Sequence, residues 1–188
     1  MTNEKAQGIM KERDCWYVLF VRTGMEDSIC SFLNQESLAC FIPKKEVIHR
    51  NAGLTRILIK PMFPGYLFIS SDLSQSEFHD TIQQLRSRRS GIVKELRYDT
   101  EGTPALTEDE QYTLDHLLSR DKVLKASRGI IENDMVVIME GPLKGYESRI
   151  TYIDRHKRQA TLSLNLCTRE VEVKVALEIV QKIHTTDS

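Results

Sequence analysis

The sequence has few cysteines, and their placement suggests neither disulfides nor a structural metal. The four cysteines stand at positions 15, 30, 40 and 167, and no two of them form a Cys-x-x-Cys pair. No histidine lies at a zinc-like spacing from them. Scattered cysteines of this kind are typical of reduced thiols inside a cell. We therefore expect no disulfide framework and no metal site.

Long apolar segments and a targeting signal are also missing. No run of about 18 apolar residues occurs, which excludes the usual membrane-spanning helix. Residues 1–14 are polar and lack the apolar core of a secretory signal. These absences predict a cytoplasmic protein.

The short motifs of common enzymes are absent as well. The chain has no Gly-x-Ser-x-Gly elbow, no phosphate-binding loop and no His-x-x-x-His pair. Its histidines and cysteines do not form a catalytic constellation. We therefore expect a protein that is not an enzyme and that needs no cofactor.

Charge is balanced over the whole chain but not locally. The chain has 26 Lys and Arg residues against 27 Asp and Glu residues. Residues 144–158, however, contain five Lys or Arg residues and two acids, a local balance of +3. Any basic surface is therefore a confined patch rather than a field over the whole protein.

The first 118 residues alternate between strand-like and helix-like patterns. Pro43 lies near the start of one strand-like run, which suggests an edge strand. Thr107 and Glu110 have the spacing of a capping box before a helix. The order β-α-β-β-β-α-β-α predicts an α+β fold, specifically a ferredoxin-like α/β sandwich. The predicted strands cover residues 16–21, 41–48, 56–60, 65–69 and 92–93, and the predicted helices cover residues 26–36, 78–85 and 107–118.

The last sixty residues have a different pattern. Residues 119–129 are basic and poor in apolar side chains, so we interpret them as a flexible linker between domains at residues 1–118 and 130–188. Short strand-like runs separated by glycines and polar turns follow, which predicts a small β-barrel. The runs cover residues 135–139, 148–153, 160–164 and 170–175.

Two glycine motifs, one in each predicted domain, carry most of the functional information. The first is Phe-Pro-Gly-Tyr at residues 63–66, where proline fixes φ and glycine permits positive φ. The second is Gly-Pro-Leu-Lys-Gly-Tyr at residues 141–146, which predicts a tight loop on a barrel rim. Each alone is compatible with an ordinary turn. Their joint occurrence with Trp-Tyr-Val at residues 16–18 and Ile-Asp at residues 153–154 is informative.

Together these motifs resemble the NusG family of transcription elongation factors, from about residue 15 to residue 183. The resemblance implies an NGN domain that binds the clamp helices of RNA polymerase, followed by a five-stranded KOW-type β-barrel. It also implies that an apolar groove faces the polymerase. Two further residues, His79 and Thr81, match positions where some specialised members touch the polymerase gate loop. The implied groove residues are Tyr17, Phe63, Pro64, Tyr66 and Ile92.

The departures from the family pattern point to a specialised member. Asn165 stands where the family usually has a phenylalanine that grips the termination factor Rho or a ribosomal protein. This replacement makes contacts with Rho and the ribosome doubtful. The chain instead has a run of residues that can carry positive charge on a predicted turn, which favours nucleic-acid binding. That run is Arg155, His156, Lys157 and Arg158, and we expect Lys144 and Arg149 to lie on the same end of the barrel.

This combination resembles LoaP, the antiterminator branch of the family, and implies a monomer that binds a hairpin in nascent RNA. Two alternatives stay open. One is a general pausing or termination factor that couples polymerase to Rho or the ribosome, and the other is a free-standing KOW RNA-binding protein. A plain solvated turn is the structural alternative for residues 155–158.

Overall fold

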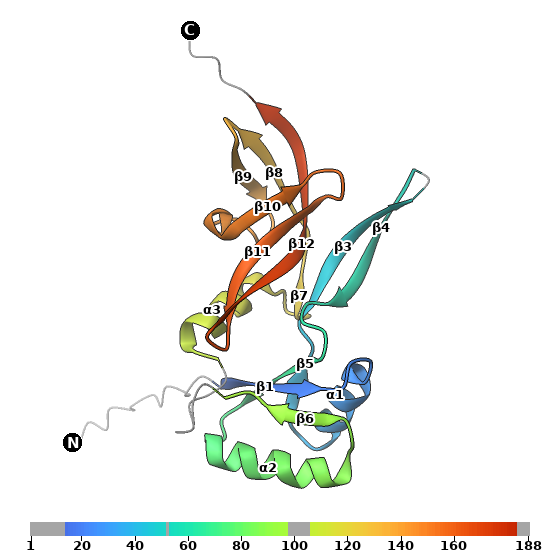
Figure 1. Ribbon diagram of the computed structural model, residues 1–188, viewed down its shortest axis with the longest axis vertical. Coiled ribbons are helices and arrows are strands. Elements are labelled where there is room, and N and C mark those ends of the chain that lie inside the picture. The colour runs from blue at the N-terminus through green and yellow to red at the C-terminus, as the bar shows by residue number, and fades with distance from the viewer. Residues whose placement is uncertain (1–13, 52, 98–105, 184–188) are drawn as a thin grey trace, which may run out of the picture.

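The computed structural model describes residues 14–51, 53–97 and 106–183, and it shows an α+β protein (Figure 1). Its first part is a four-stranded antiparallel sheet with the strand order β2-β5-β1-β6. This order, together with the two helices that connect strands of the sheet, confirms the ferredoxin-like prediction. The elements are β1 (Cys15–Val21), α1 (Glu26–Gln35), β2 (Ala39–Phe41), β5 (Tyr66–Ser71), α2 (Gln75–Arg88) and β6 (Ile92–Glu95).

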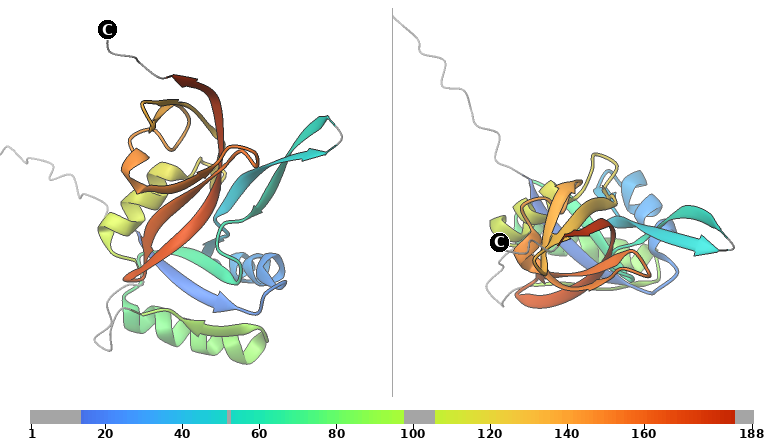
Figure 2. Two further views of the ribbon diagram at one scale, coloured as in Figure 1. Left: turned by 45° about the horizontal axis from the view of Figure 1, so that its top comes forward. Right: turned by 90° about the horizontal axis from the view of Figure 1, so that it is seen from above.

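A long hairpin projects from this sheet beside the second half of the molecule (Figures 1 and 2). It consists of β3 (Lys44–Asn51) and β4 (Leu54–Pro61). The sequence had predicted one strand over residues 41–48. The structure divides it into β2 and β3 at Pro43, because proline has no N–H to donate to a continuing ladder.

The second part is a small five-stranded barrel, as predicted, and it is partly open. Its strand order is β10-β11-β12-β8-β9, so that β9 and β10 form the two edges, and the 3-10 turn η1 (Glu147–Arg149) precedes β10. Residues on β11 are alternately buried and partly exposed, as expected for a strand with one face toward a core. The strands are β8 (Ser127–Glu132), β9 (Met135–Glu140), β10 (Ile150–Asp154), β11 (Gln159–Leu166) and β12 (Arg169–Ile183).

The segment that we expected to be a flexible linker, residues 119–129, is packed between the two parts. It contains β7 (Val123–Leu124), which pairs in parallel with β3, and it leads directly into β8. Leu124 and Ser127 are fully buried. The basic composition was misleading because Lys122 lies over the rings of Trp16 and Phe41, at 4.5 and 5.0 Å. A lysine can cover aromatic surface while its ammonium keeps a polar partner.

Each face of the four-stranded sheet is buried by different elements. Helices α1 and α2 cover one face, where the core includes Leu19, Ile29 and Phe78. Helix α3 (Glu108–Leu117) and the barrel cover the other face, because Trp16 and Phe68 belong to one apolar cluster with residues of α3 and β11. Within the described ranges, no helix is both long enough and apolar enough to span a membrane.

Candidate functional site

The Pro64-Gly65 turn enters β5 and is fixed by a buried carboxylate. Gly65 has φ +83°, and a Cβ there would lie 3.0 Å from the ring of Phe20. The side chain of Glu26, in the first turn of α1, accepts hydrogen bonds from the N–H groups of Gly65 at 2.9 Å and Gly24 at 2.6 Å. Burial opposes the ionisation of Glu26, but backbone N–H groups outweigh it and lower the pKa of this carboxyl. The turn is therefore held to α1 by an ionised side chain.

Three of the five residues expected in an exposed polymerase groove are core residues. Tyr17 stacks on Phe78 with 4.0 Å between ring centroids, and its hydroxyl donates to the Leu73 carbonyl at 2.6 Å. Ile92 and Phe63 are also buried. Tyr17 and Ile92 face α1 and α2, whereas Phe63 belongs to the cluster on the opposite side. The five residues therefore do not line one groove, because successive strand residues point to opposite faces.

The other two predicted groove residues do reach the surface together. Pro64 is exposed, Tyr66 is half-buried, and Phe20 lies beside Tyr66 with 5.3 Å between ring centroids. We call these three residues the aromatic rim. The sequence analysis missed Phe20. Its spacing from Trp16 and Val18 places all three on one face of β1, which is the signal that would have found it.

The sheet face behind the aromatic rim is closed by α3 and the barrel. The Trp16 N–H donates to the side chain of Gln111 on α3 at 2.9 Å. The turn between β11 and β12 is tied to the same helix, because the Thr168 N–H donates to the Glu110 carboxylate at 3.3 Å. Only the rim of this sheet face is therefore accessible while the two parts of the molecule are packed together.

The two expected gate-loop residues lie on α2. The His79 ring is paired with Glu95 of β6, which also pairs with Arg97. The Thr81 hydroxyl donates to the Glu77 carbonyl within the helix at 2.8 Å. Both side chains have structural partners, and Thr81 is half-buried. Each of these side chains therefore has a structural role, in pairing α2 with β6 or in bonding within α2.

The predicted basic turn at residues 155–158 does connect two strands, β10 and β11. Arg155 and His156 are exposed. Lys157 pairs with the aspartate that ends β10, at 3.3 Å, and Arg158 pairs with a glutamate of β12 at 3.0 Å. The turn thus holds four residues that can carry positive charge, and two of them, Lys157 and Arg158, already lie near a carboxylate.

Lys144 and Arg149 do not share this end of the barrel. Arg149 precedes β10 and Arg155 follows it, and a strand rises by about 3.3 Å per residue. Lys144 lies in the loop after β9, where the neighbouring Pro142 lines a small cavity with Leu117 of α3. The six predicted RNA-binding residues therefore divide into a turn cluster and two separate residues.

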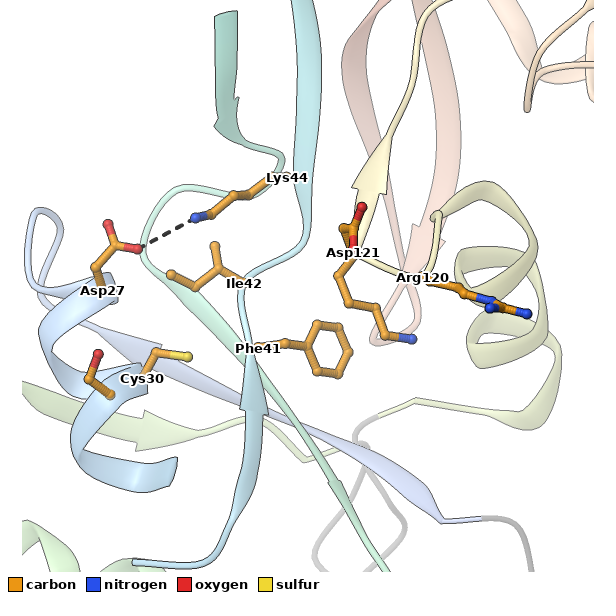
Figure 3. A pocket seen from close by; sticks show the side chains of 9 residues that line it. Asp27, Cys30, Phe41, Ile42, Lys44, Arg120 and Asp121 are labelled. Carbon is orange, nitrogen blue, oxygen red and sulfur yellow. Dashed lines mark ion pairs between the residues drawn. The ribbon is translucent and has the colours of Figure 1, made fainter. Parts of the chain in front are cut away.

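An open hollow of about 310 Å3 lies between α1, β3 and the segment before β7 (Figure 3). Asp27 and Lys44 face each other across it with 3.6 Å between charged atoms. Lys122, also on its wall, pairs with Asp115 at 3.0 Å. The charged side chains around the hollow are paired with one another. This pairing is typical of a contact between packed elements rather than of a ligand-binding site.

The remaining titratable and thiol groups are dispersed. In the part of the chain that the structure describes, no three His, Cys, Asp or Glu side chains gather to hold a metal ion. The Cys30 thiol donates to the Cys40 carbonyl at 3.4 Å, and Cys40 is buried. These contacts give both cysteines a place in the packing of α1 against β2.

Comparison with known proteins identifies relatives over nearly the full length. The family model described as "Transcription termination factor nusG" matches residues 14–113, more than half of the chain. The transcription termination/antitermination protein NusG of Thermus thermophilus is 24% identical over 179 residues, which cover 89% of this chain and 97% of that protein. The protein of the same name from Haemophilus influenzae is 23% identical over 195 residues, which cover 98% of this chain and 100% of that protein.

A solved structure titled "Domain interaction in Thermotoga maritima NusG" is also similar. It is 18% identical in sequence with a TM-score of 0.47, and the match covers 90% of this chain and 96% of that one.

Proposed function

Because the chain belongs to the NusG family of transcription termination factors, we propose that it is a specialised monomeric member that acts as an antiterminator. In this proposal the first domain (residues 1–118) binds the clamp helices of RNA polymerase. The barrel (residues 130–188) binds a hairpin in the nascent RNA. The observation that supports RNA binding most directly is the basic turn at residues 155–158, in which Arg155 and His156 are exposed.

The aromatic rim is the surface that we propose for polymerase. Aromatic side chains that are partly exposed beside a proline are common anchors at protein interfaces. The Pro64-Gly65 turn holds Tyr66 in a fixed position, since the Glu26 carboxylate accepts a hydrogen bond from the turn. Docking at the rim leaves the packing of α3 and the barrel undisturbed.

Tyr66→Ala in the full chain should weaken polymerase binding by about 1–3 kcal/mol, because truncation removes the anchor. Tyr112→Ala is the matched control, since Tyr112 is 56% exposed on α3 and lies outside the rim. Binding to core polymerase is measured by fluorescence anisotropy, with circular dichroism to verify folding. Equal affinities for the two variants would exclude the rim from the interface.

Antitermination is tested by transcription in a purified system of polymerase, template and nucleotides. Readthrough of a terminator should rise when the protein is added, and it should rise more on a template whose leader RNA forms a hairpin. A second template carries the same leader with the stem mismatched. Equal readthrough on both templates would favour the general elongation factor instead.

The general factor that engages Rho remains the second candidate. Asn165, at the position where the family usually has the gripping phenylalanine, is exposed near the end of β11. An amide there offers less apolar surface for a partner than a phenyl ring. We therefore expect no enhancement of Rho-dependent termination, and tight binding of Rho to the full chain would reverse this choice.

A further inference from the structure

The outer face of the barrel carries a row of three aligned side chains. Tyr152 lies opposite Thr161, and Thr161 lies opposite Lys174, across three neighbouring strands. Tyr152 is 63% exposed and Lys174 is also exposed. The residues that flank Thr161 on β11, Ala160 and Leu162, are buried in the core. The row therefore faces away from the barrel interior, with an aromatic ring at one end and an ammonium group at the other.

The β3–β4 hairpin adds three cationic side chains and a histidine next to this row. Lys45 lies opposite Lys60, and His49 lies opposite Arg56, so that all four point to one face of the hairpin. The pKa of Lys45 is held below its usual value, first by burial and then by the nearby charges of Lys174 and Lys60. Strands β3 and β12 also lie in contact, so these ammonium groups of the hairpin and the barrel are close enough to repel one another.

These positive charges are not neutralised locally. Among the ion pairs of the described residues, Lys45, Lys60 and Lys174 have no carboxylate partner. Glu46 lies on the other face of the hairpin and accepts a hydrogen bond from the Ala126 N–H. Glu172 shares the outer face with Lys174 and accepts a hydrogen bond from the Thr151 hydroxyl. Three unpaired ammonium groups repel one another, and a bound anion would relieve that repulsion.

The same side of the molecule holds the basic turn. The loop between β10 and β11 points toward the β3–β4 hairpin in Figure 1 and in the left view of Figure 2. The hairpin, the row on the barrel and the turn thus lie on one side of the molecule, which combines cations with an exposed aromatic ring. Surfaces of this composition bind single-stranded nucleic acid, because phosphates pair with the cations while unstacked bases lie on the ring.

We propose that the RNA-binding surface of the barrel extends onto the β3–β4 hairpin of the first domain. Phosphates of one RNA strand contact Lys45, Lys60 and Lys174, and an unpaired base stacks on Tyr152. This extension rests on the proposed RNA-binding function. The exposed tyrosine favours the loop of an RNA hairpin over a blunt duplex, since the bases of a duplex are already stacked.

The test uses the full chain and three fluorescent probes: an RNA stem-loop with an unpaired uridine loop, the same stem as a blunt RNA duplex, and the corresponding blunt DNA duplex. Anisotropy titrations at two or more salt concentrations give the affinity and its salt dependence. The stem-loop should bind most tightly. Lys60→Gln combined with Lys174→Gln should weaken its binding by roughly tenfold or more, and should reduce the slope of log affinity against log salt by about 1–2.

Two matched comparisons isolate the surface. Arg56→Gln should weaken binding, whereas Arg50→Gln on the opposite face of the same hairpin should not. Tyr152→Ala should weaken binding of the stem-loop by roughly 5- to 100-fold, whereas Tyr152→Phe should retain it because the ring remains.

The outcomes separate this extension from the RNA-binding function itself. If the wild-type chain binds the stem-loop and Arg155→Gln with Lys157→Gln weakens it, but the Lys60 and Lys174 variant binds like wild type, the extension is wrong and the turn alone binds RNA. If the wild-type chain binds none of the RNA probes, the proposed function fails and the extension with it. Equal or tighter binding of the blunt DNA duplex would overturn the assignment to RNA.

Discussion

The Pro64-Gly65 turn and the loop at residues 141–145 are held by different chemistry. In the first part of the molecule, the ionised Glu26 of α1 accepts a hydrogen bond from the Gly65 N–H at 2.9 Å. In the barrel, the neutral Ser127 hydroxyl of β8 accepts the Leu143 N–H at 3.1 Å. Both supporting side chains are buried and come from another element. The comparison teaches that each motif is a turn held by a hydrogen bond to a polar side chain far away in the sequence. Only the side chain that holds the first turn, Glu26, is charged.

The two turns also differ in how closely neighbouring atoms pack against their glycines. A Cβ on Gly141 would lie 2.5 Å from the Ser127 hydroxyl oxygen and 2.7 Å from the Ser127 Cα. A Cβ on Gly65 would meet its nearest atom at 3.0 Å, on the side chain of Phe20. A phenyl ring can move, whereas backbone cannot without displacing a strand. The barrel loop should therefore tolerate a side chain at its glycine less well than the Pro64-Gly65 turn does.

The largest expected effect is on stability from Gly141→Ala. The substitution combines a strained φ of +101° with a clash against β8, and should lower the free energy of unfolding by about 2–5 kcal/mol. Gly145→Ala is the control, because Gly145 has φ +87° but no atom within 4 Å of a new Cβ, so it should cost about 1–2 kcal/mol. Urea unfolding measures both, and equal losses would mean that the approach to Ser127 is unimportant.

A smaller loss is expected from Glu26→Gln. The glutamine keeps the size of the side chain but loses the charge that strengthens its hydrogen bonds, at a cost of about 1.5–3 kcal/mol. Asp27→Asn is the neighbouring control, since the Asp27 side chain is 86% exposed. Urea unfolding at neutral pH compares the two. If Glu26→Gln is no more destabilising than Asp27→Asn, the carboxylate does not support the turn.

The smallest expected effect is on how stability depends on pH, which should differ between the hydrogen bonds made by Glu26 and by Ser127. The pKa of Glu26 is lower in the folded chain than in the unfolded chain. Its contribution is therefore complete above the unfolded pKa of about 4.3 and disappears as pH falls through the folded pKa. Between pH 7 and acid conditions, Glu26→Gln should lose less stability than wild type does.

Ser127→Ala provides the contrast for this measurement. Its hydroxyl does not titrate in that range, so the stability of Ser127→Ala should fall in parallel with that of wild type as pH is lowered. Both profiles come from urea unfolding at a series of pH values. A Glu26→Gln profile parallel to wild type would show that this carboxyl does not titrate differently on folding.

Local features of the sequence predicted the elements well. The capping box of Thr107 and Glu110 was predicted, and both of its hydrogen bonds are present at the start of α3. The basic turn between β10 and β11 was also located correctly. These predictions succeeded because caps and turns depend on residues a few positions apart.

Predictions that needed contacts between distant segments were less successful. Tyr17 and Ile92 were assigned to an exposed groove, although α1 and α2 bury them. Arg149 was expected beside Arg155, although β10 separates them. An apolar run such as residues 16–21 indicates a buried strand, but it does not indicate which elements cover each face.

The sequence by itself determined the α+β class, the position of the glycine turns and the basic turn, and its motifs pointed to the family. These properties follow from local periodicity, backbone constraints and short motifs. Tertiary structure alone decided that residues 119–129 pack between the two parts of the molecule and that β3 of the hairpin lies against β12 of the barrel. The physical reason is that burial and charge clustering depend on which remote strands pack together, and no local pattern specifies that choice.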